Sequence, residues 1–362
     1  MSLVVDSDTH IAESQGMWQS FSAELYPRRP ALVTGPTDTL YGRKNAFWLI
    51  DGNIFPKPAG KGGFSLITPS ESEFQRTRGD IAVACRECTD VPARLRDMDR
   101  LGVDVQVIYP TLFLVYLTDD VELEIALCQA YNQWMANVWA QSHNRLRWTA
   151  VLPLRSIPAS VEQLRQAREH GAVGVFFRGV ERDRTLDERY FFPIYEEAQS
   201  LDLPICVHTG AGAPAITALF DVGRNSSFPH IRMQPLIAFR DIVANRVPEQ
   251  FPRLRFGFIE AGASWVPYVL HAIKRLLKDD PARYGPRLFE QYRLYVACEA
   301  DEDIPYLIQY IGEDYLLVGS DYGHNDPSEE RELVAAMRAR EDVPERVVDK
   351  IFGANPARFY GL

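Results

Sequence analysis

The sequence lacks the features that mark membrane and nucleic-acid-binding proteins. No run of eighteen apolar residues occurs, so no transmembrane span is predicted. Acidic residues number 49 against 39 basic ones, and the formal net charge is -10. A negative protein is poorly suited to bind nucleic acid or an anionic membrane. The first residues lack the charged and apolar regions of a signal peptide. We therefore expect a cytoplasmic protein whose partners include neither nucleic acid nor membrane.

Cysteine is also scarce. The chain has five Cys, an odd number, and most of them lie in or beside apolar stretches. Cys85 and Cys88 form one CxxC pair, but no second pair or nearby His completes a zinc site. The pattern therefore favours reduced thiols in a reducing compartment over disulfides.

Short apolar strands alternate with amphipathic helical stretches along most of the chain. Strands buried on both faces read as continuous apolar runs, which is typical of a parallel sheet flanked by helices. Eight such strands predict an α/β fold, a (β/α)8 TIM barrel that spans residues 1–362 as one domain. A doubly wound open sheet is the alternative, but no GxGxxG follows the first strand. The predicted strands are Leu3–Asp6, Val103–Tyr109, Trp148–Leu152, Val173–Phe177, Pro204–Val207, Leu254–Ile259, Leu294–Ala297 and Tyr315–Val318.

A long insertion separates the first two predicted strands. It is rich in Pro, Gly and aromatic residues, and Asp51-Gly52 lies between two apolar runs. Asp-Gly in that position predicts a hairpin with a type I′ turn. We expect residues 28–90 to form a lid that caps the barrel mouth, because their apolar side chains need cover. A second insertion is expected between Thr209 and about Arg232.

Acids and histidines follow the predicted strands. Because the carboxyl ends of barrel strands meet at one face, these side chains should converge on one pocket. Uncompensated charges are costly in an apolar pocket, and bound cations would explain them. The candidates are Asp8 and His10 in VVDSDTHIAE, His208 in ICVHTG, Glu260 in FGFIEAG, Glu299 in YVACEADED and Asp321 in LLVGSDYGH.

These motifs resemble the amidohydrolase superfamily. The match is strongest to the amidohydrolase-related branch that includes aminocarboxymuconate semialdehyde decarboxylase and aromatic acid decarboxylases. The segments RLRDMDRLGVDVQVIYPT, RLRFGFIEAGASWVP and IFGANPARFYGL add to the resemblance. It implies that Asp8, His10, His208 and Asp321 occupy metal-ligand positions. In that branch the sixth strand normally ends in a His that assists catalysis, and here Glu260 stands in its place.

Two functional hypotheses follow from this inventory of two imidazoles and four carboxylates. Carboxylate-rich sites suit two iron or manganese ions. Together with Glu260 and Glu299 as further ligands, the set resembles amidohydrolase-fold non-haem di-iron monooxygenases of terpenoid biosynthesis. This oxidoreductase hypothesis, favoured slightly, implies O2, an electron donor and an apolar acid or thioester-type substrate to hydroxylate. The alternative is a decarboxylase or hydrolase with one Zn or Mn, acting on a small aromatic or unsaturated carboxylic acid.

Other residues are candidates for catalysis or for binding a small-molecule substrate. Glu260, Asp321 and His324 are the candidate catalytic residues. Arg178 ends the fourth strand and could pair with a substrate carboxylate. The remaining candidates for substrate contact are Trp265, Tyr109 and His230. The sequence leaves open whether the chain forms a homodimer.

Overall fold

The computed structural model describes residues 3–57, 59–221, 228–278 and 280–362. Its centre is one eight-stranded parallel sheet whose strands follow one another in chain order. All eight predicted strands are present, and most of their residues are buried. The strands are β1 (Val5–Ile11), β5 (Val105–Pro110), β6 (Leu146–Ala150), β7 (Ala172–Arg178), β10 (Ile205–His208), β11 (Phe256–Ile259), β12 (Leu294–Cys298) and β13 (Leu316–Val318).

The last strand returns to the first, which makes the sheet a barrel. The backbone N–H of His10 donates to the carbonyl of Tyr322 over 2.7 Å, and that of Asp321 donates to the carbonyl of Asp8 over 2.9 Å. The approach is close at Gly319, where a Cβ atom would lie 2.1 Å from Cβ of Asp8. The predicted TIM barrel is therefore confirmed.

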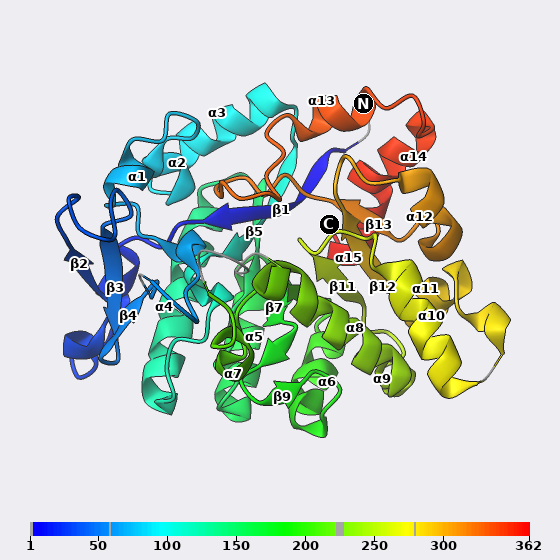
Figure 1. Ribbon diagram of the computed structural model, residues 1–362, viewed down its shortest axis with the longest axis horizontal. Helices are drawn as coiled ribbons and strands as arrows, with labels where there is room; N and C mark the ends of the chain where they lie inside the picture. The colour runs from blue at the N-terminus through cyan, green and yellow to red at the C-terminus, as the bar shows by residue number, and fades with distance from the viewer. Residues whose placement is uncertain (1–2, 58, 222–227, 279) are drawn as a thin grey trace.

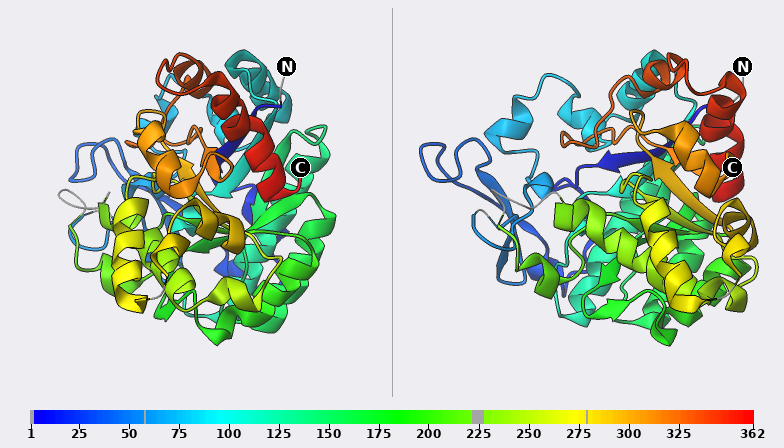
Figure 2. Two further views of the ribbon diagram at one scale, coloured as in Figure 1. Left: turned by 90° about the vertical axis from the view of Figure 1, so that its right-hand side faces the viewer. Right: turned by 45° about the vertical axis from the view of Figure 1, so that its right-hand side comes forward.

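Helices cover the outside of this barrel (Figures 1 and 2). Many of them begin with a Pro in the first turn, where a missing N–H costs nothing. The helices after the insertion are α3 (Val91–Leu101), α4 (Val121–Ala140), α5 (Ile157–Glu169), α6 (Phe192–Ser200), α7 (Pro214–Thr217), α8 (Gln234–Ala244), α9 (Val247–Gln250), α10 (Val266–Leu277), α11 (Pro286–Tyr292), α12 (Ile304–Ile311), α13 (Leu333–Arg338), α14 (Glu345–Asp349) and α15 (Asn355–Tyr360).

The insertion after β1 forms its own small sheet and two short helices. The predicted hairpin is present: Asp51 and Gly52 have φ values of 50° and 77°, as a type I′ turn requires. Figure 1 shows this sheet beyond the C-terminal end of β1. Arg78 also reaches the loop after β13, where it donates to the carbonyl oxygens of Gly323 and His324. The elements are β2 (Ala31–Thr34), β3 (Ala46–Ile50), β4 (Asn53–Phe55), α1 (Glu73–Arg76) and α2 (Val83–Arg86).

These contacts support the lid hypothesis for residues 28–90, and capping itself remains a prediction. The second predicted insertion, Thr209 to Arg232, contains the short helix α7; its residues 222–227 lie outside the described part of the chain. Across the described residues, no helix combines the length and apolar character that crossing a membrane requires.

Candidate metal centre

Polar side chains from four strand ends meet inside the barrel mouth. Asp8 and His10 are two residues apart on β1, so they point to the same side of that strand. His208 ends β10, Glu260 directly follows β11, and Asp321 lies three residues beyond β13. All five side chains are almost fully buried. These ionisable groups therefore lie close together and are largely shielded from water.

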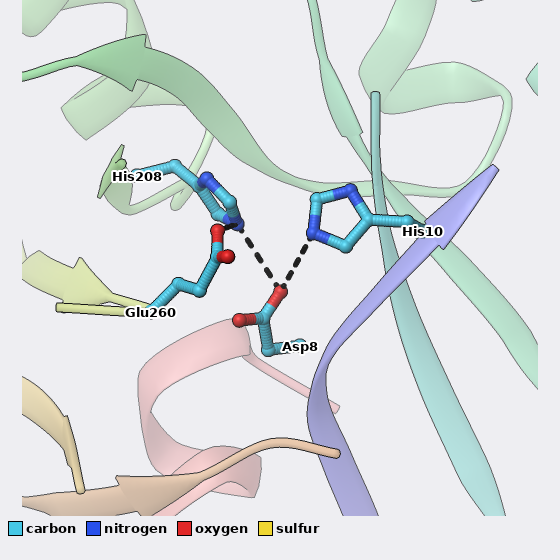
Figure 3. Close-up of side chains that lie close together, drawn as sticks. All are labelled: Asp8, His10, His208 and Glu260. Carbon is cyan, nitrogen blue, oxygen red and sulfur yellow. Dashed lines mark hydrogen bonds and ion pairs between the residues drawn. The ribbon is translucent and has the colours of Figure 1, made fainter. Parts of the chain in front are cut away.

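The first group consists of Asp8, His10, His208 and Glu260, drawn in Figure 3. One ligand atom from each lies within 4.8 Å of the others. Nε2 of His208 is 3.2 Å from an oxygen of Asp8 and 3.2 Å from an oxygen of Glu260. Nε2 of His10 is 3.4 Å from the same oxygen of Asp8. Both imidazoles thus face the Asp8 carboxylate (Figure 3).

A second group adjoins the first and shares residues with it. It contains Glu260, Asp321, His324 and Asp326. His10 belongs to both neighbourhoods, because its Nε2 also lies 3.4 Å from an oxygen of Asp321. The His324 ring stacks on the His10 ring with the centroids 3.6 Å apart. The two groups form one continuous cluster, which offers enough ligand atoms for one or two metal ions.

One ring nitrogen of each histidine contacts a backbone carbonyl or a hydroxyl, and the other nitrogen faces the carboxylates of the cluster. Nδ1 of His10 lies 3.1 Å from the carbonyl of Pro110, and Nδ1 of His208 lies 3.1 Å from the carbonyl of Thr209. A carbonyl can only accept, so in the neutral ring each Nδ1 carries the proton and each Nε2 keeps its lone pair. Nε2 of His324 contacts the hydroxyl of Thr111 at 2.9 Å. This pattern is typical of metal-binding histidines, whose second nitrogen is held by an oxygen.

The carboxylates of the cluster repel one another when no cation lies between them. Burial raises the pKa of Glu260, against the opposing effect of His208. Burial together with Glu260 and Asp326 raises the pKa of Asp321 well above its usual value. Burial also acts on Asp8, but His208 and His10 outweigh it and lower the pKa of that carboxyl. A bound cation would relieve the repulsion and keep all three carboxylates ionised.

Several buried polar atoms of the cluster lack a hydrogen-bond partner. They include Nε2 of His10, Oε1 of Glu260 and both carboxylate oxygens of Asp321. Leaving such groups unsatisfied is costly, and a metal ion that accepts their lone pairs would remove the cost. Imidazole nitrogens and carboxylate oxygens are the donors that Zn2+, Mn2+ and Fe2+ take in proteins. The donor set therefore fits a divalent metal.

Backbone conformation supports the same conclusion. Glu260 has a φ of 62° and Asp321 a φ of 55°, in the left-handed region that such residues seldom adopt. Such a conformation costs a non-glycine residue about 1–3 kcal/mol. Several described residues away from the cluster also adopt it, and at Glu260 and Asp321 it accompanies the turn of both carboxylates from strand ends into the cluster.

Three predicted site residues have other partners. Glu299 lies outside the cluster, and its carboxylate is paired with Arg232 at 2.5 Å, where both side chains are partly exposed. Arg178 is bonded to Glu181 and to the carbonyl of Val115 at 2.7 Å. Glu299 therefore has an ion-pair partner outside the cluster, and Arg178 is paired within the protein; metal binding by Glu299 and substrate binding by Arg178 remain predictions.

Trp265 is likewise turned away from the mouth. Its indole N–H donates to the carbonyl of Gly262 over 2.7 Å, and its ring packs on Phe239 and Phe258. Phe239 belongs to α8, so Trp265 fills the layer between barrel and helices. The predicted substrate contact by Trp265 is replaced by core packing.

Tyr109 and His230 lie closer to the cluster. The Tyr109 ring is 4.7 Å from the His208 ring, but its hydroxyl is paired with that of Tyr360 at 2.8 Å. His230 is completely buried, and its ring contacts Phe64 of the insertion at 5.1 Å. Tyr109 therefore packs against the His208 ring, while His230 packs against the insertion through Phe64.

Sequence reasoning missed two contributors. Asp326 brings a further carboxylate to the second group. It lies only five residues after Asp321, so its position near Asp321 could have been predicted from the sequence. Arg94 is fully buried and donates to the carbonyl of His10 over 2.8 Å and to Gln106 over 2.8 Å. It lies 84 residues from His10, and nothing in the local pattern indicates this contact.

The amidohydrolase family model matches residues 5–362. The chain belongs to the amidohydrolase family. The resemblance inferred from the motifs is therefore confirmed, including its decarboxylase branch. The 2-amino-3-carboxymuconate-6-semialdehyde decarboxylase of Dictyostelium discoideum is 24% identical over 290 residues, which are 76% of this chain and 77% of that protein.

Solved structures agree on the fold. An amidohydrolase from Mycobacterium avium subsp. paratuberculosis superposes with a TM-score of 0.76 at 18% identity, covering 100% of this chain and 98% of the other. The 5-carboxyvanillate decarboxylase of Novosphingobium aromaticivorans, solved with manganese and 4-hydroxy-3-methoxy-5-nitrobenzoic acid, superposes with a TM-score of 0.70 at 18% identity. In that comparison 100% of this chain and 96% of the other are covered. This chain is therefore a metal-dependent enzyme of the amidohydrolase fold.

Proposed function

We propose that this amidohydrolase is a metal-dependent decarboxylase or hydrolase that acts on a carboxylic acid. The observation that carries the proposal is a buried cluster in which Asp8, His10, His208 and Glu260 form one group, and His10 also lies beside Asp321, with lone pairs of His10 and Asp321 unsatisfied. One relative in sequence and one solved structure of the same fold are decarboxylases. Of the two functional hypotheses raised by the sequence, the comparisons favour this alternative over the monooxygenase.

Asp8, His10, His208 and Asp321 would hold one divalent ion, Zn2+ or Mn2+. Such an ion supplies a Lewis acid that binds the substrate carboxylate or a neighbouring oxygen and stabilises developing negative charge. The protein keeps the ligands in place through the bonds from the His10 and His208 Nδ1 atoms to backbone carbonyls. Arg94 fixes the His10 backbone from behind.

Glu260 is the group placed to move a proton. In decarboxylation the bond from carbon to the carboxylate breaks, CO2 leaves, and a proton takes its place on carbon. The Glu260 carboxyl accepts the Thr209 hydroxyl on Oε2 over 2.5 Å, so Oε1 is left free in the buried site. In a hydrolase, the same carboxylate would take a proton from the attacking water. Glu260 thus has the position that a His holds in the related decarboxylases.

A screen of aromatic and unsaturated carboxylic acids for CO2 release and for hydrolysis tests the proposal. We expect turnover by the metal-loaded chain, loss of turnover after chelation, and recovery on adding Mn2+ or Zn2+. His208→Ala should lose activity while keeping its circular dichroism spectrum. Turnover that survives complete removal of metal would contradict the proposal.

A second candidate is a non-haem di-iron monooxygenase, favoured by one observation. Glu260 and Asp321 both belong to a second, carboxylate-rich group with His324 and Asp326. Two irons held by both groups would require O2 and an electron donor, and neither named relative is an oxygenase. Two equivalents of iron per purified chain, with substrate-dependent O2 uptake, would favour this candidate over the decarboxylase or hydrolase.

A further inference from the structure

A cavity of about 480 Å3 lies between the insertion and the loops after β5 and β10. One wall comes from the insertion, through Phe55, Phe64 and Ile67, and the other from Val115, Ala211 and Ala218. Ligand pockets typically have volumes of 300–1,000 Å3 and mostly apolar walls. In size and lining this cavity is suited to a small organic molecule.

One wall of the cavity belongs to the loop that follows His208. Ala211 is three residues beyond His208, and the backbone N–H of Gly210 donates to the carbonyl of His230 over 2.8 Å. Ile67 lines both this cavity and a smaller one that also contains His324. A molecule that reaches the cluster from the mouth would therefore lie against these walls.

Two exposed lysines lie at the rim of this cavity, and the Lys57 ammonium donates to the carbonyl of Lys61 over 2.6 Å. Lys57 and Lys61 line it, and they are two of only six lysines in a chain of net charge -10. No Asp or Glu is among the described residues that line it. The rim is held to the loop after β10 by backbone contacts. The N–H of Gly62 donates to the carbonyl of Phe220 over 2.9 Å, and Lys61 and Asp221 form an isolated antiparallel β-bridge.

We infer that the substrate is an elongated amphiphilic acid, not an acid with a single aromatic ring. Its apolar body fills the cavity, and a second anionic group, a carboxylate or a phosphate, binds Lys57 and Lys61 at the rim. A one-ring acid would leave most of the cavity to water. This inference rests on the proposed function for the reacting end of the molecule, while the cavity and its lysines supply the distal end.

Binding of 8-anilinonaphthalene-1-sulfonate, an aromatic anion whose fluorescence rises in apolar surroundings, tests the inference on the metal-loaded chain. We expect saturable binding that weakens at least fivefold in the double variant Lys57→Gln/Lys61→Gln. Lys274→Gln, an exposed lysine on α10, is the matched control and should bind as the wild type does. Equal binding by the double variant and the wild type would overturn the role of the lysines.

A second pair of variants tests the cavity itself. Ala218→Phe should fill it and weaken binding about tenfold, whereas Ala215→Phe, exposed on α7 and outside the lining, should not. Equal binding by Ala218→Phe and the wild type would place the probe elsewhere and overturn the inference. Ala215 lies in the first turn of α7 and Ala218 directly follows its last residue; both are exposed, so neither change disturbs the barrel core.

Competition separates the two anion chemistries. Decyl phosphate and decanoate should displace the probe at least fivefold better than decanol, and this advantage should vanish in the double lysine variant. A stronger effect of either anion assigns the distal group as phosphate or carboxylate. Displacement by decanol equal to that by both anions would contradict an anionic distal group.

The same titration on His208→Ala separates this inference from the proposed function. Probe binding should persist in that variant, because the probe's sulfonate binds at the rim and not at the cluster. Loss of binding in His208→Ala would put the probe at the metal cluster and overturn the inference. Loss of metal dependence in the turnover assay would instead defeat the proposed function and leave the cavity result unaffected.

Discussion

Glu260→Gln should stabilise the metal-free protein and weaken its response to metal. Without a cation, burial raises the pKa of Glu260 from 4.5 to about 8. The folded state then holds a proton that the unfolded state releases. Stability conferred at low pH is therefore lost as the pH rises from about 4.5 to about 8. Gln carries no charge and removes this loss.

The size of the effect follows from the shift. Each pKa unit is worth 1.36 kcal/mol, so the full shift sets an upper limit of about 5 kcal/mol. His208 lies beside this carboxyl and favours its charged form, and we therefore expect less, about 2 kcal/mol. A chain of this length has an unfolding entropy of about 0.8 kcal/mol/K, so the metal-free variant should melt about 3 °C higher at pH 8.

Metal reverses the order. Loss of one carboxylate from the cluster should weaken metal binding tenfold to hundredfold, by analogy with changes around other metal sites. A hundredfold change removes up to about 2.7 kcal/mol of the stabilisation by metal. With saturating Mn2+ the wild type should then melt at or above the variant.

Differential scanning fluorimetry at pH 8, with and without Mn2+, measures both effects. Glu196→Gln, an exposed glutamate on α6, is the control and should melt with the wild type in both conditions. A Glu260→Gln variant that melts below the wild type without metal, or that shows the full metal-induced shift, would refute the electrostatic account of the cluster.

Three further variants probe the surroundings of the cluster. Burial raises the pKa of Glu124 to about 7, so the stability of the wild type should fall as the pH rises from about 4.5 to 7. Glu124→Gln should remove about 2 kcal/mol of that fall, measured by urea unfolding at pH 5 and pH 8. An equal fall in both proteins would contradict this. Gly319→Ala forces a methyl group against Asp8 and should cost at least about 1–3 kcal/mol and lower the metal content measured by mass spectrometry, unlike a harmless surface change. Arg94→Met leaves the buried His10 carbonyl and Gln106 without their donor, so urea unfolding should show a loss of about 3 kcal/mol, and an unchanged midpoint would argue against its supporting role.

The barrel and most of the cluster could be predicted because their signals are local. Continuous apolar runs such as Val173–Phe177 mark buried parallel strands, and the eight runs fix the strand count. In a barrel, the residues that follow such strands must share one face, which brings Asp8, His208, Glu260 and Asp321 together. Asp51-Gly52 predicted its hairpin because few other residues accept a positive φ twice in succession.

The partners of some other candidate residues could not be predicted, because a side chain's direction there depends on distant residues. Glu299 follows a strand as the other candidate ligands do, but Arg232, in the π-helical turn Phe228–Met233, is paired with its carboxylate. Trp265 lies six residues after β11, where the start of α10 turns its ring outward to Phe239. For Arg178 the partner Glu181 is only three residues away, so the local charge pattern could have indicated that pair.

Metal content of the full chain, purified without added metal, tests the central claim most directly. The account predicts about one equivalent of Mn or Zn per chain in the wild type and almost none in His208→Ala with an unchanged circular dichroism spectrum. Equal metal content in the two proteins, or a wild type that binds no divalent metal when it is supplied, would contradict the assignment of the cluster as a metal centre.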